Sequence, residues 1–156
     1  MSKKLEEATF AAGCFWGVED TFMNTKGVVE TEVGFTGGDV ESPSYERVCT
    51  GDTGHAEAIH LKYDPDIISY EQLLNIFWKL HDPTQIDRQG PDIGRQYRSM
   101  IFYHNQDQKE LSEQSKEKEQ KTYKKPIATE IEKAGPFYRA EEYHQKYVQK
   151  TGRRVC

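Results

Sequence analysis

The stretch ATFAAGCFWGVEDTFMNTKGVVETEVGF, residues 8–35, predicts a strand, a helix and a second strand in immediate succession. Residues 8–13 are mostly small and apolar, as in a short buried strand. Apolar side chains then recur at helical spacing from residue 15 to about residue 25, and Gly27 lies just past the expected end of that helix. Residues 29–35 alternate in character, which is typical of a second strand.

The rest of the chain continues the alternation of strands and helices. Ser69 and Gln72 resemble a capping box at one helix start, and Asn105 opens another helix. The order of elements predicts an α/β (α+β) fold, a mixed sheet with packed helices similar to a ferredoxin-like split βαβ core, with long loops at 36–54 and 84–94. The other expected elements are strands at 57–63, 97–103 and 127–131, and helices at 69–80, from 105 onward and at 140–150.

Composition narrows the classes of protein to which the chain can belong. Its 156 residues fit a single domain, 1–156, and nine Tyr, seven Phe and two Trp can form one core although only 35% of residues are hydrophobic. The net charge of −5 argues against a nucleic-acid partner. No apolar run is long enough for a membrane span and the start, MSKKLEEATF, lacks a signal-peptide segment, so we expect a cytoplasmic protein with no membrane partner.

The cysteines indicate chemistry rather than cross-linking. Three cysteines at irregular spacing match neither a secreted disulfide framework nor a zinc site, and in a reducing compartment such thiols are inert or catalytic. Cys14 lies where the first strand turns into the first helix, and the unpaired N–H groups of a helix start favour a thiolate there. The alternative is an inert cysteine that fills the core beside Phe15 and Trp16.

Two carboxylates could take part in the same chemistry. Glu57 shares a strand face with Ile59 and Leu61, so alternation turns it toward the core, where a desolvated carboxyl group stays protonated and can donate a proton. The alternative for Glu57 is an exposed carboxylate at a strand end. Asp92 lies on a Gly-rich loop just before Tyr97, and its alternative role is to cap that loop.

Four segments of the chain together resemble a known family, the peptide methionine sulfoxide reductases of the A type. The resemblance extends from Phe10 to about Tyr147, and the four segments follow the family's order and approximate spacing. They are GCFWG at 13–17, the stretch from Tyr45 to Glu57 that ends in TGHAE, GPDIGRQYRS at 90–99 and FYRAEEYHQKY at 137–147.

The resemblance implies an enzyme that repairs oxidised proteins by reducing the S epimer of methionine sulfoxide, free or in peptides and proteins, without a metal or organic cofactor. In the implied reaction a thiolate attacks the sulfur, an acid assists the oxygen, and the cysteine becomes a sulfenic acid. The implied roles are Cys14 as nucleophile, Glu57 as proton donor, Tyr45 and Tyr97 as hydroxyls that hold the oxygen, Phe15 and Trp16 as the S-methyl pocket, and Asp92 as a residue that orients the polar side.

The resemblance also implies a second cysteine that returns Cys14 to its thiol form. Family members often carry this cysteine in a flexible, Gly-rich C-terminal tail, whereas the tail expected here, about 148–156, is short and holds only Cys156. We expect a Cys14–Cys156 disulfide, with Cys49 as the alternative resolving thiol. Thioredoxin or another dithiol reductant would then reduce the disulfide, and the chain is expected to act as a monomer.

Two other functions fit parts of the pattern. His55 and His60 flank Glu57, and a cysteine with a histidine could form a cysteine hydrolase, although alternation puts His60 on the face opposite Glu57. The chain could also be a non-enzymatic redox-sensing or peptide-binding module in which Cys14 is only oxidised.

Overall fold

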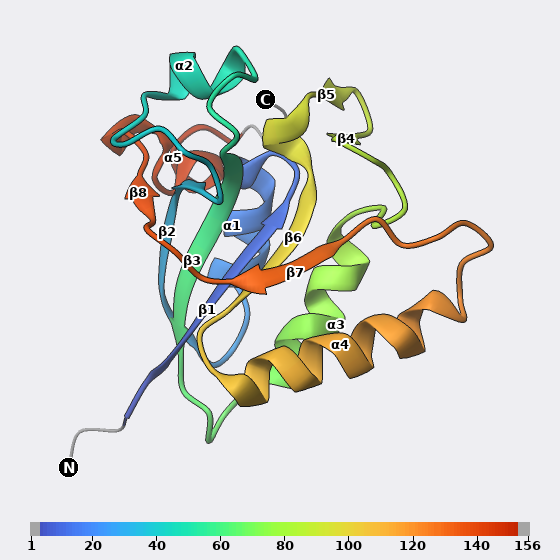
Figure 1. The fold of residues 1–156 in the computed structure, drawn as a ribbon. Coiled ribbons are helices and arrows are strands. Elements are labelled where there is room, and N and C mark those ends of the chain that lie inside the picture. The colour runs from blue at the N-terminus through green and yellow to red at the C-terminus, as the bar shows by residue number, and fades with distance from the viewer. Residues whose placement is uncertain (1–3, 153–156) are drawn as a thin grey trace.

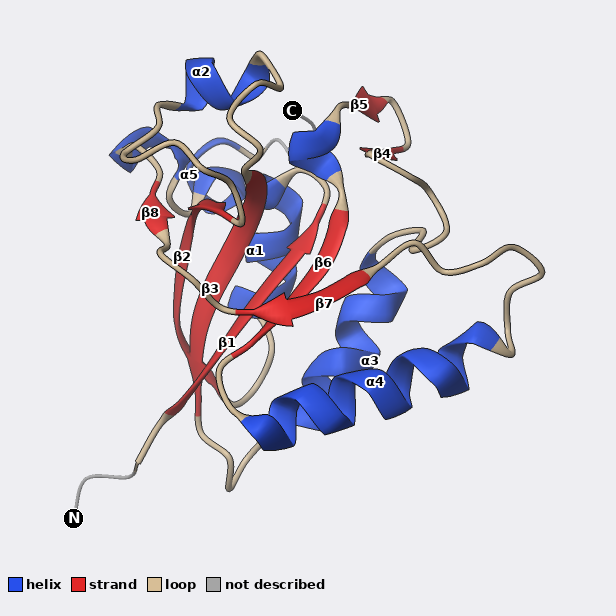
Figure 2. Ribbon diagram, in the orientation of Figure 1, coloured by secondary structure: helices blue, strands red, loops and turns tan. Residues whose placement is uncertain are grey.

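The structure, a computed structural model, describes residues 4–152 and contains a six-stranded mixed sheet in the order β7-β6-β1-β3-β2-β8 (Figures 1 and 2). The central four strands, β6-β1-β3-β2, are each antiparallel to their neighbours. Two strand–helix–strand units interleave to give this order, so the predicted ferredoxin-like split βαβ core is confirmed. The core elements are β1 Glu6–Ala12, α1 Phe15–Met23, β2 Val28–Thr36, β3 Ala56–Tyr63, α3 Tyr70–Leu80 and β6 Ser99–Tyr103.

Two short strands extend the sheet at its edges. β7, Glu130–Lys133, pairs in parallel with β6, and β8, Tyr138–Arg139, pairs antiparallel with β2. Between these two strands the chain crosses the front face of the sheet (Figure 2). On that face a small cluster of buried residues packs beneath Ala134 and Phe137.

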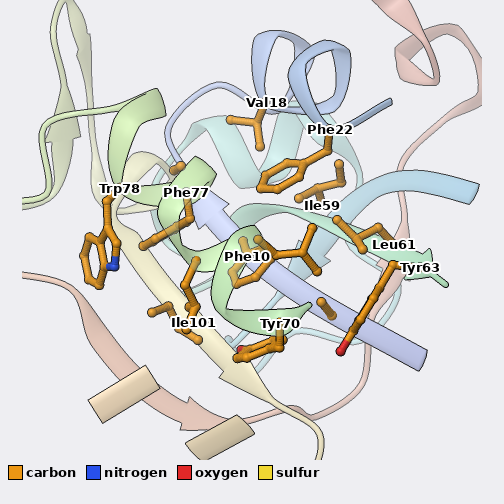
Figure 3. Close-up of a cluster of buried hydrophobic side chains, with 14 of the residues drawn as sticks. Phe10, Val18, Phe22, Ile59, Leu61, Tyr63, Tyr70, Phe77, Trp78 and Ile101 are labelled. Carbon is orange, nitrogen blue, oxygen red and sulfur yellow. The ribbon is translucent and has the colours of Figure 1, made fainter. Parts of the chain in front are cut away.

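The main core lies on the opposite face, beneath α1 and α3 (Figures 1 and 3). α4, Gln106–Gln120, packs against α3. Apolar side chains from β1 and β3 meet aromatic side chains from both helices, and the ring centroids of Phe10 and Phe22 are 5.5 Å apart. Among the fully buried members of this cluster are Phe10, Phe22, Ile59, Leu61, Leu73, Leu74 and Phe77.

Two helix starts follow the sequence pattern. The Ser69 hydroxyl accepts the backbone N–H of Gln72, whose side chain accepts the backbone N–H of Ser69, so the capping box is confirmed. The Asn105 side chain accepts the N–H of Gln108 at the start of α4. Within residues 4–152 no helix is long and apolar enough to cross a membrane.

The expected loops contain elements that the sequence pattern did not predict. The stretch 36–54 holds a short helix, α2 Tyr45–Cys49, and the stretch 84–94 holds a hairpin of β4 Arg88–Gln89 and β5 Asp92–Ile93. Tyr97 ends a 3-10 turn, η1 Arg95–Tyr97, instead of beginning the strand predicted at 97–103.

The helix predicted at 140–150 is wrong as a single element. The structure has a 3-10 turn, η2 Glu142–His144, and then a short helix, α5 Tyr147–Thr151. Lys146 separates them because its backbone is left-handed, with φ 54° and ψ 39°. The tail expected at about 148–156 thus begins within α5, and its last four residues, with Cys156, lie outside the described residues.

Candidate active site

Cys14 is the N-cap residue of α1, two residues after the end of β1. The chain turns there through Gly13, whose φ of +92° is open only to glycine at low cost and whose added Cβ would lie 2.9 Å from the Gln89 side chain. No acidic residue lies in the first turn of α1, so no carboxylate there offsets the positive partial charge of the helix N-terminus. In this structure Cys14 is disulfide-bonded, whereas Cys49 is a free thiol.

Glu57 is completely buried in β3, on the same strand face as Ile59 and Leu61, as alternation predicts. Its Oε1 accepts the backbone N–H of Phe15 at 3.3 Å, and that amide directly follows Cys14. Its Oε2 is buried and has no hydrogen-bond partner among the described residues. The acid is therefore adjacent to the cysteine and keeps one oxygen available for a further partner.

The environment of Glu57 favours its uncharged form. Burial raises the pKa of Glu57 to about 8; the Phe15 N–H opposes this shift, and the negative charge of Asp92 adds to it. At neutral pH the carboxyl group is therefore mainly protonated. A protonated carboxyl group can donate a hydrogen bond or a proton from its second oxygen.

Tyr45 and Tyr97 both lie close enough to Glu57 to be affected by its charge. Tyr45 is the first residue of α2, and its ring stacks on Phe15 with centroids 6.2 Å apart. Burial, followed by the Glu57 charge, raises the pKa of Tyr45, and the same two causes raise the pKa of Tyr97. Both hydroxyl groups are therefore protonated donors at physiological pH, and they come from the second and third of the four motif segments.

Cys49 lies one helical turn after Tyr45 in α2. Its thiol lies next to the Tyr45 hydroxyl, and its carbonyl accepts the side-chain amide of Gln96 at 3.4 Å. Burial raises the pKa of Cys49, which favours the neutral thiol. The structure thus places Cys49 beside the site in its reduced form.

The apolar wall of the site consists of Phe15, which is fully buried, and Trp16, which is 9% exposed. Sequence reasoning did not find the residues that hold the indole of Trp16. Its Nε1–H donates to Nδ1 of His144 at 2.9 Å, and the ring of Tyr147 stacks on it with centroids 3.8 Å apart. The only signal for these two partners was their position in FYRAEEYHQKY, because the pattern predicted one continuous helix there.

The histidines that suggested a cysteine hydrolase have other partners. His55 accepts the N–H of Gly38 at 3.0 Å through Nδ1, and its Nε2 is 2.6 Å from the carbonyl oxygen of Val40, so it fixes the loop before α2. His60 pairs with Glu7 at 3.1 Å on the opposite side of β3 from Glu57. Neither imidazole is left to act as a base for Cys14.

Asp92 lies in β5, and burial raises the pKa of its carboxyl group. Its charge contributes to the raised pKa of Glu57, so it acts on the site electrostatically. Among residues 4–152 no cluster of three His, Cys, Asp or Glu side chains could hold a metal ion.

Asp92→Asn is expected to lower the pKa of Glu57, because the substitution removes a negative charge that opposes ionisation. The protonated acid would then be lost at a lower pH, and the alkaline fall in turnover would shift downward by up to about one pH unit. The pH profile of kcat measures this shift. Asp87→Asn, on the same loop, is the matched control, and an alkaline limb that does not move in Asp92→Asn would refute the coupling.

The site therefore joins a cysteine, an uncharged acid, two tyrosines and an aromatic wall from three of the four motif segments. The family model described as "Peptide methionine sulfoxide reductase" matches residues 6–156. The chain belongs to the peptide methionine sulfoxide reductase family. This reductase converts methionine sulfoxide to methionine, and the hydrolase and sensor alternatives are set aside.

Known relatives of the reductase agree in sequence and in fold. A "Peptide methionine sulfoxide reductase MsrA" of Methanosarcina acetivorans is 58% identical over 150 residues, 95% of this chain and 80% of the relative. The crystal structure of Mxr1 from Saccharomyces cerevisiae in reduced form has a TM-score of 0.92 and 39% identity, and the match covers 98% of this chain and 89% of Mxr1. Mxr1 in complex with Trx2 matches with a TM-score of 0.67 and 25% identity, over 94% of this chain and 89% of Mxr1.

Proposed function

We propose that the reductase acts on the S epimer of methionine sulfoxide, free or in peptides and proteins, with Cys14 as nucleophile and Glu57 as proton donor. The observation that carries this proposal is the buried, uncharged carboxyl group of Glu57. One of its oxygens is bound to the amide that follows Cys14, and the other has no partner among the described residues. An acid held in this way can protonate an oxygen on the sulfur that Cys14 attacks.

The proposed reaction moves one oxygen atom between two sulfur atoms. The Cys14 thiolate attacks the sulfoxide sulfur, and Glu57 gives its proton to the sulfoxide oxygen, which Tyr45 and Tyr97 hold by hydrogen bonds. The sulfur–oxygen bond breaks, methionine leaves and the oxygen ends on Cys14 as a sulfenic acid, so the substrate is reduced and the thiol is oxidised.

Phe15 and Trp16 are proposed to bind the S-methyl group of the substrate. Support comes from the aromatic cluster around Cys14, in which Trp16 is held by His144 and Tyr147. Such a wall excludes water and strengthens the hydrogen bonds to the sulfoxide oxygen. Asp92 is proposed to orient the polar side of the site.

Turnover of resolved S and R sulfoxides with dithiothreitol tests the proposal. We expect methionine from the S epimer only, and no hydrolysis of an ester substrate. Equal rates for the two epimers, or turnover confined to the R epimer, would contradict it.

Cys156 is proposed to resolve the sulfenic acid, with release of water and formation of a Cys14–Cys156 disulfide. A thioredoxin-like dithiol protein would then reduce the disulfide, and the yeast relative captured in complex with Trx2 supports a reductant of this kind. Cys49 is the less favoured alternative because it is held within α2, next to Tyr45.

After one turnover without reductant, peptide mass mapping is expected to recover a Cys14–Cys156 disulfide. Cys156→Ser is expected to keep the first turnover, which needs only Cys14, and to stop later turnovers with thioredoxin. Cys49→Ser is the matched control and should cycle normally. Recovery of a Cys14–Cys49 bridge would overturn the assignment of Cys156.

We further propose that residues 1–156 form one catalytic domain that acts as a cytoplasmic monomer. One six-stranded sheet with one main core supports one domain. A reducing compartment such as the cytoplasm would also supply the dithiol reductant that the proposed cycle needs.

A further inference from the structure

Glu19 is a buried carboxylate in α1, one turn after Trp16, and it lies outside the chemistry described above. Glu19 is only 1% exposed to solvent. Oε1 accepts the backbone N–H of Lys146 at 2.5 Å, and Oε2 accepts the hydroxyl of Thr31 at 2.8 Å. A buried carboxylate needs such partners, so both of its contacts are structurally significant.

The contact with Lys146 fixes an unusual turn of the chain. Lys146 has φ 54° and ψ 39°, a left-handed conformation that is unfavourable for a residue with a Cβ atom. It is also the N-cap residue of α5 and has no capping side chain of its own, so Glu19 satisfies its N–H. Because the turn immediately precedes Tyr147, it determines where the Tyr147 ring lies.

The other side of the same segment is held by Gln145. Its side-chain amide accepts the N–H of Val33 and donates to the carbonyls of Val33 and Ala140, each at 2.9 Å, like a short additional strand on β2. Residues 144–147 are thus hydrogen-bonded to β2 through Gln145 and to α1 through Glu19. Gln145 and Lys146, which make these contacts, lie between His144 and Tyr147, the two residues that hold Trp16.

We propose that Glu19 is a positioning residue for the S-methyl pocket, because it ties the helix that carries Trp16 to the segment that stacks on Trp16. The inference rests on the proposed role of Trp16 in substrate binding. Glu19 contacts neither the sulfoxide nor Cys14 in this account, and it acts through Lys146 and Tyr147. Loss of its carboxylate would let the turn at Lys146 relax and would loosen the indole.

The test compares Glu19→Ala with Glu19→Gln in a Trp78→Phe background, in which Trp16 is the only tryptophan. Glu19→Ala is expected to raise the KM for an S-sulfoxide peptide about tenfold with a smaller change in kcat, and to make Trp16 fluorescence easier to quench with acrylamide. Glu19→Gln is expected to restore both values, because its amide oxygen can accept the Lys146 N–H while its amide N–H donates to Thr31.

Asp64→Ala is the matched control for loss of a buried acid. Asp64 is 5% exposed and accepts the N–H of Asp66, but it lies after β3 at the end remote from Glu57. It is expected to lower the melting temperature without changing KM or quenching. If Glu19→Ala does not fold, Thr31→Val takes its place in the test. It removes the hydrogen bond from Thr31 to the Glu19 carboxylate and should likewise make Trp16 fluorescence easier to quench.

The inference is overturned if Glu19→Ala, or Thr31→Val in its place, melts at a lower temperature yet keeps the native KM and native quenching well below that temperature. Failure of the proposed function would look different, since the unmodified chain would then not turn over the S-sulfoxide. The quenching measurement needs no turnover and separates the two failures.

Discussion

Glu57→Gln is expected to lower the rate of sulfoxide reduction by roughly 10²–10⁴-fold, the usual contribution of a positioned general acid. The amide has nearly the same shape and can still accept the Phe15 N–H, but it cannot give a proton to the sulfoxide oxygen. In the unmodified enzyme, kcat should fall as the pH rises through about 8, where Glu57 ionises, and this fall should be absent from the variant.

The same substitution should make the fold more stable at alkaline pH. The folded-state pKa of Glu57 is raised from an ordinary value of 4.5 to about 8, so between these values the folded chain binds a proton that the unfolded chain has released. The free energy of unfolding therefore falls with rising pH across this window, and the amide removes that loss. We expect Glu57→Gln to gain melting temperature relative to the unmodified chain at pH 8 and to gain less near pH 5.

This combination of lower activity and higher alkaline stability separates lost chemistry from misfolding. Glu32→Gln is the matched control, since Glu32 lies on the neighbouring strand in a solvent-exposed pair with Arg139 at 3.3 Å. It should change neither activity nor the pH dependence of melting. A Glu57→Gln variant that keeps most of its turnover would show that another group supplies the proton.

Cys14→Ser is expected to abolish turnover, including the first, because a serine hydroxyl is almost entirely un-ionised at neutral pH and is a far weaker nucleophile than a thiolate. The fold should be kept, because the start of α1 does not depend on a cap hydrogen bond from the Cys14 side chain. A single-turnover assay for methionine, with purified enzyme in excess over S-sulfoxide, measures this loss.

Substrate binding is expected to survive in Cys14→Ser, since the S-methyl pocket is formed by Phe15 and Trp16. Titration of Trp16 fluorescence with an S-sulfoxide peptide would show it. Cys49→Ser is the matched control and should keep the first turnover. Methionine formed by Cys14→Ser at close to the native rate would remove Cys14 from the role of nucleophile.

The sequence pattern predicted those parts of the fold that depend on local periodicity. Alternation in β3 put Glu57 on the core face with Ile59, and the structure buries it completely. The strand-to-helix junction placed Cys14 at a helix start, and the Ser69 capping box marked the start of α3. These features are determined within a few residues of the chain, so a single sequence contains them.

The parts that the sequence pattern did not predict depend on contacts between distant segments. α2 is only five residues long, too short for a helical period to appear, and Glu141 accepts the N–H of its first residue, Tyr45. The break at Lys146 depends on Glu19, which is 127 positions away in the chain. His144 likewise acquires its role only where the fold brings it to Trp16. The periodicity of the sequence carries no signal for such contacts between distant residues.

The central claim is that Glu57 is an uncharged acid beside Cys14 at neutral pH. An infrared difference titration of the unmodified enzyme against Glu57→Gln observes this carboxyl group directly, through its C=O stretching band. The structure predicts a protonated-carboxyl band that is absent from the variant and disappears with a midpoint near pH 8. A band that is already lost near the ordinary glutamate pKa of 4.5 would contradict the account.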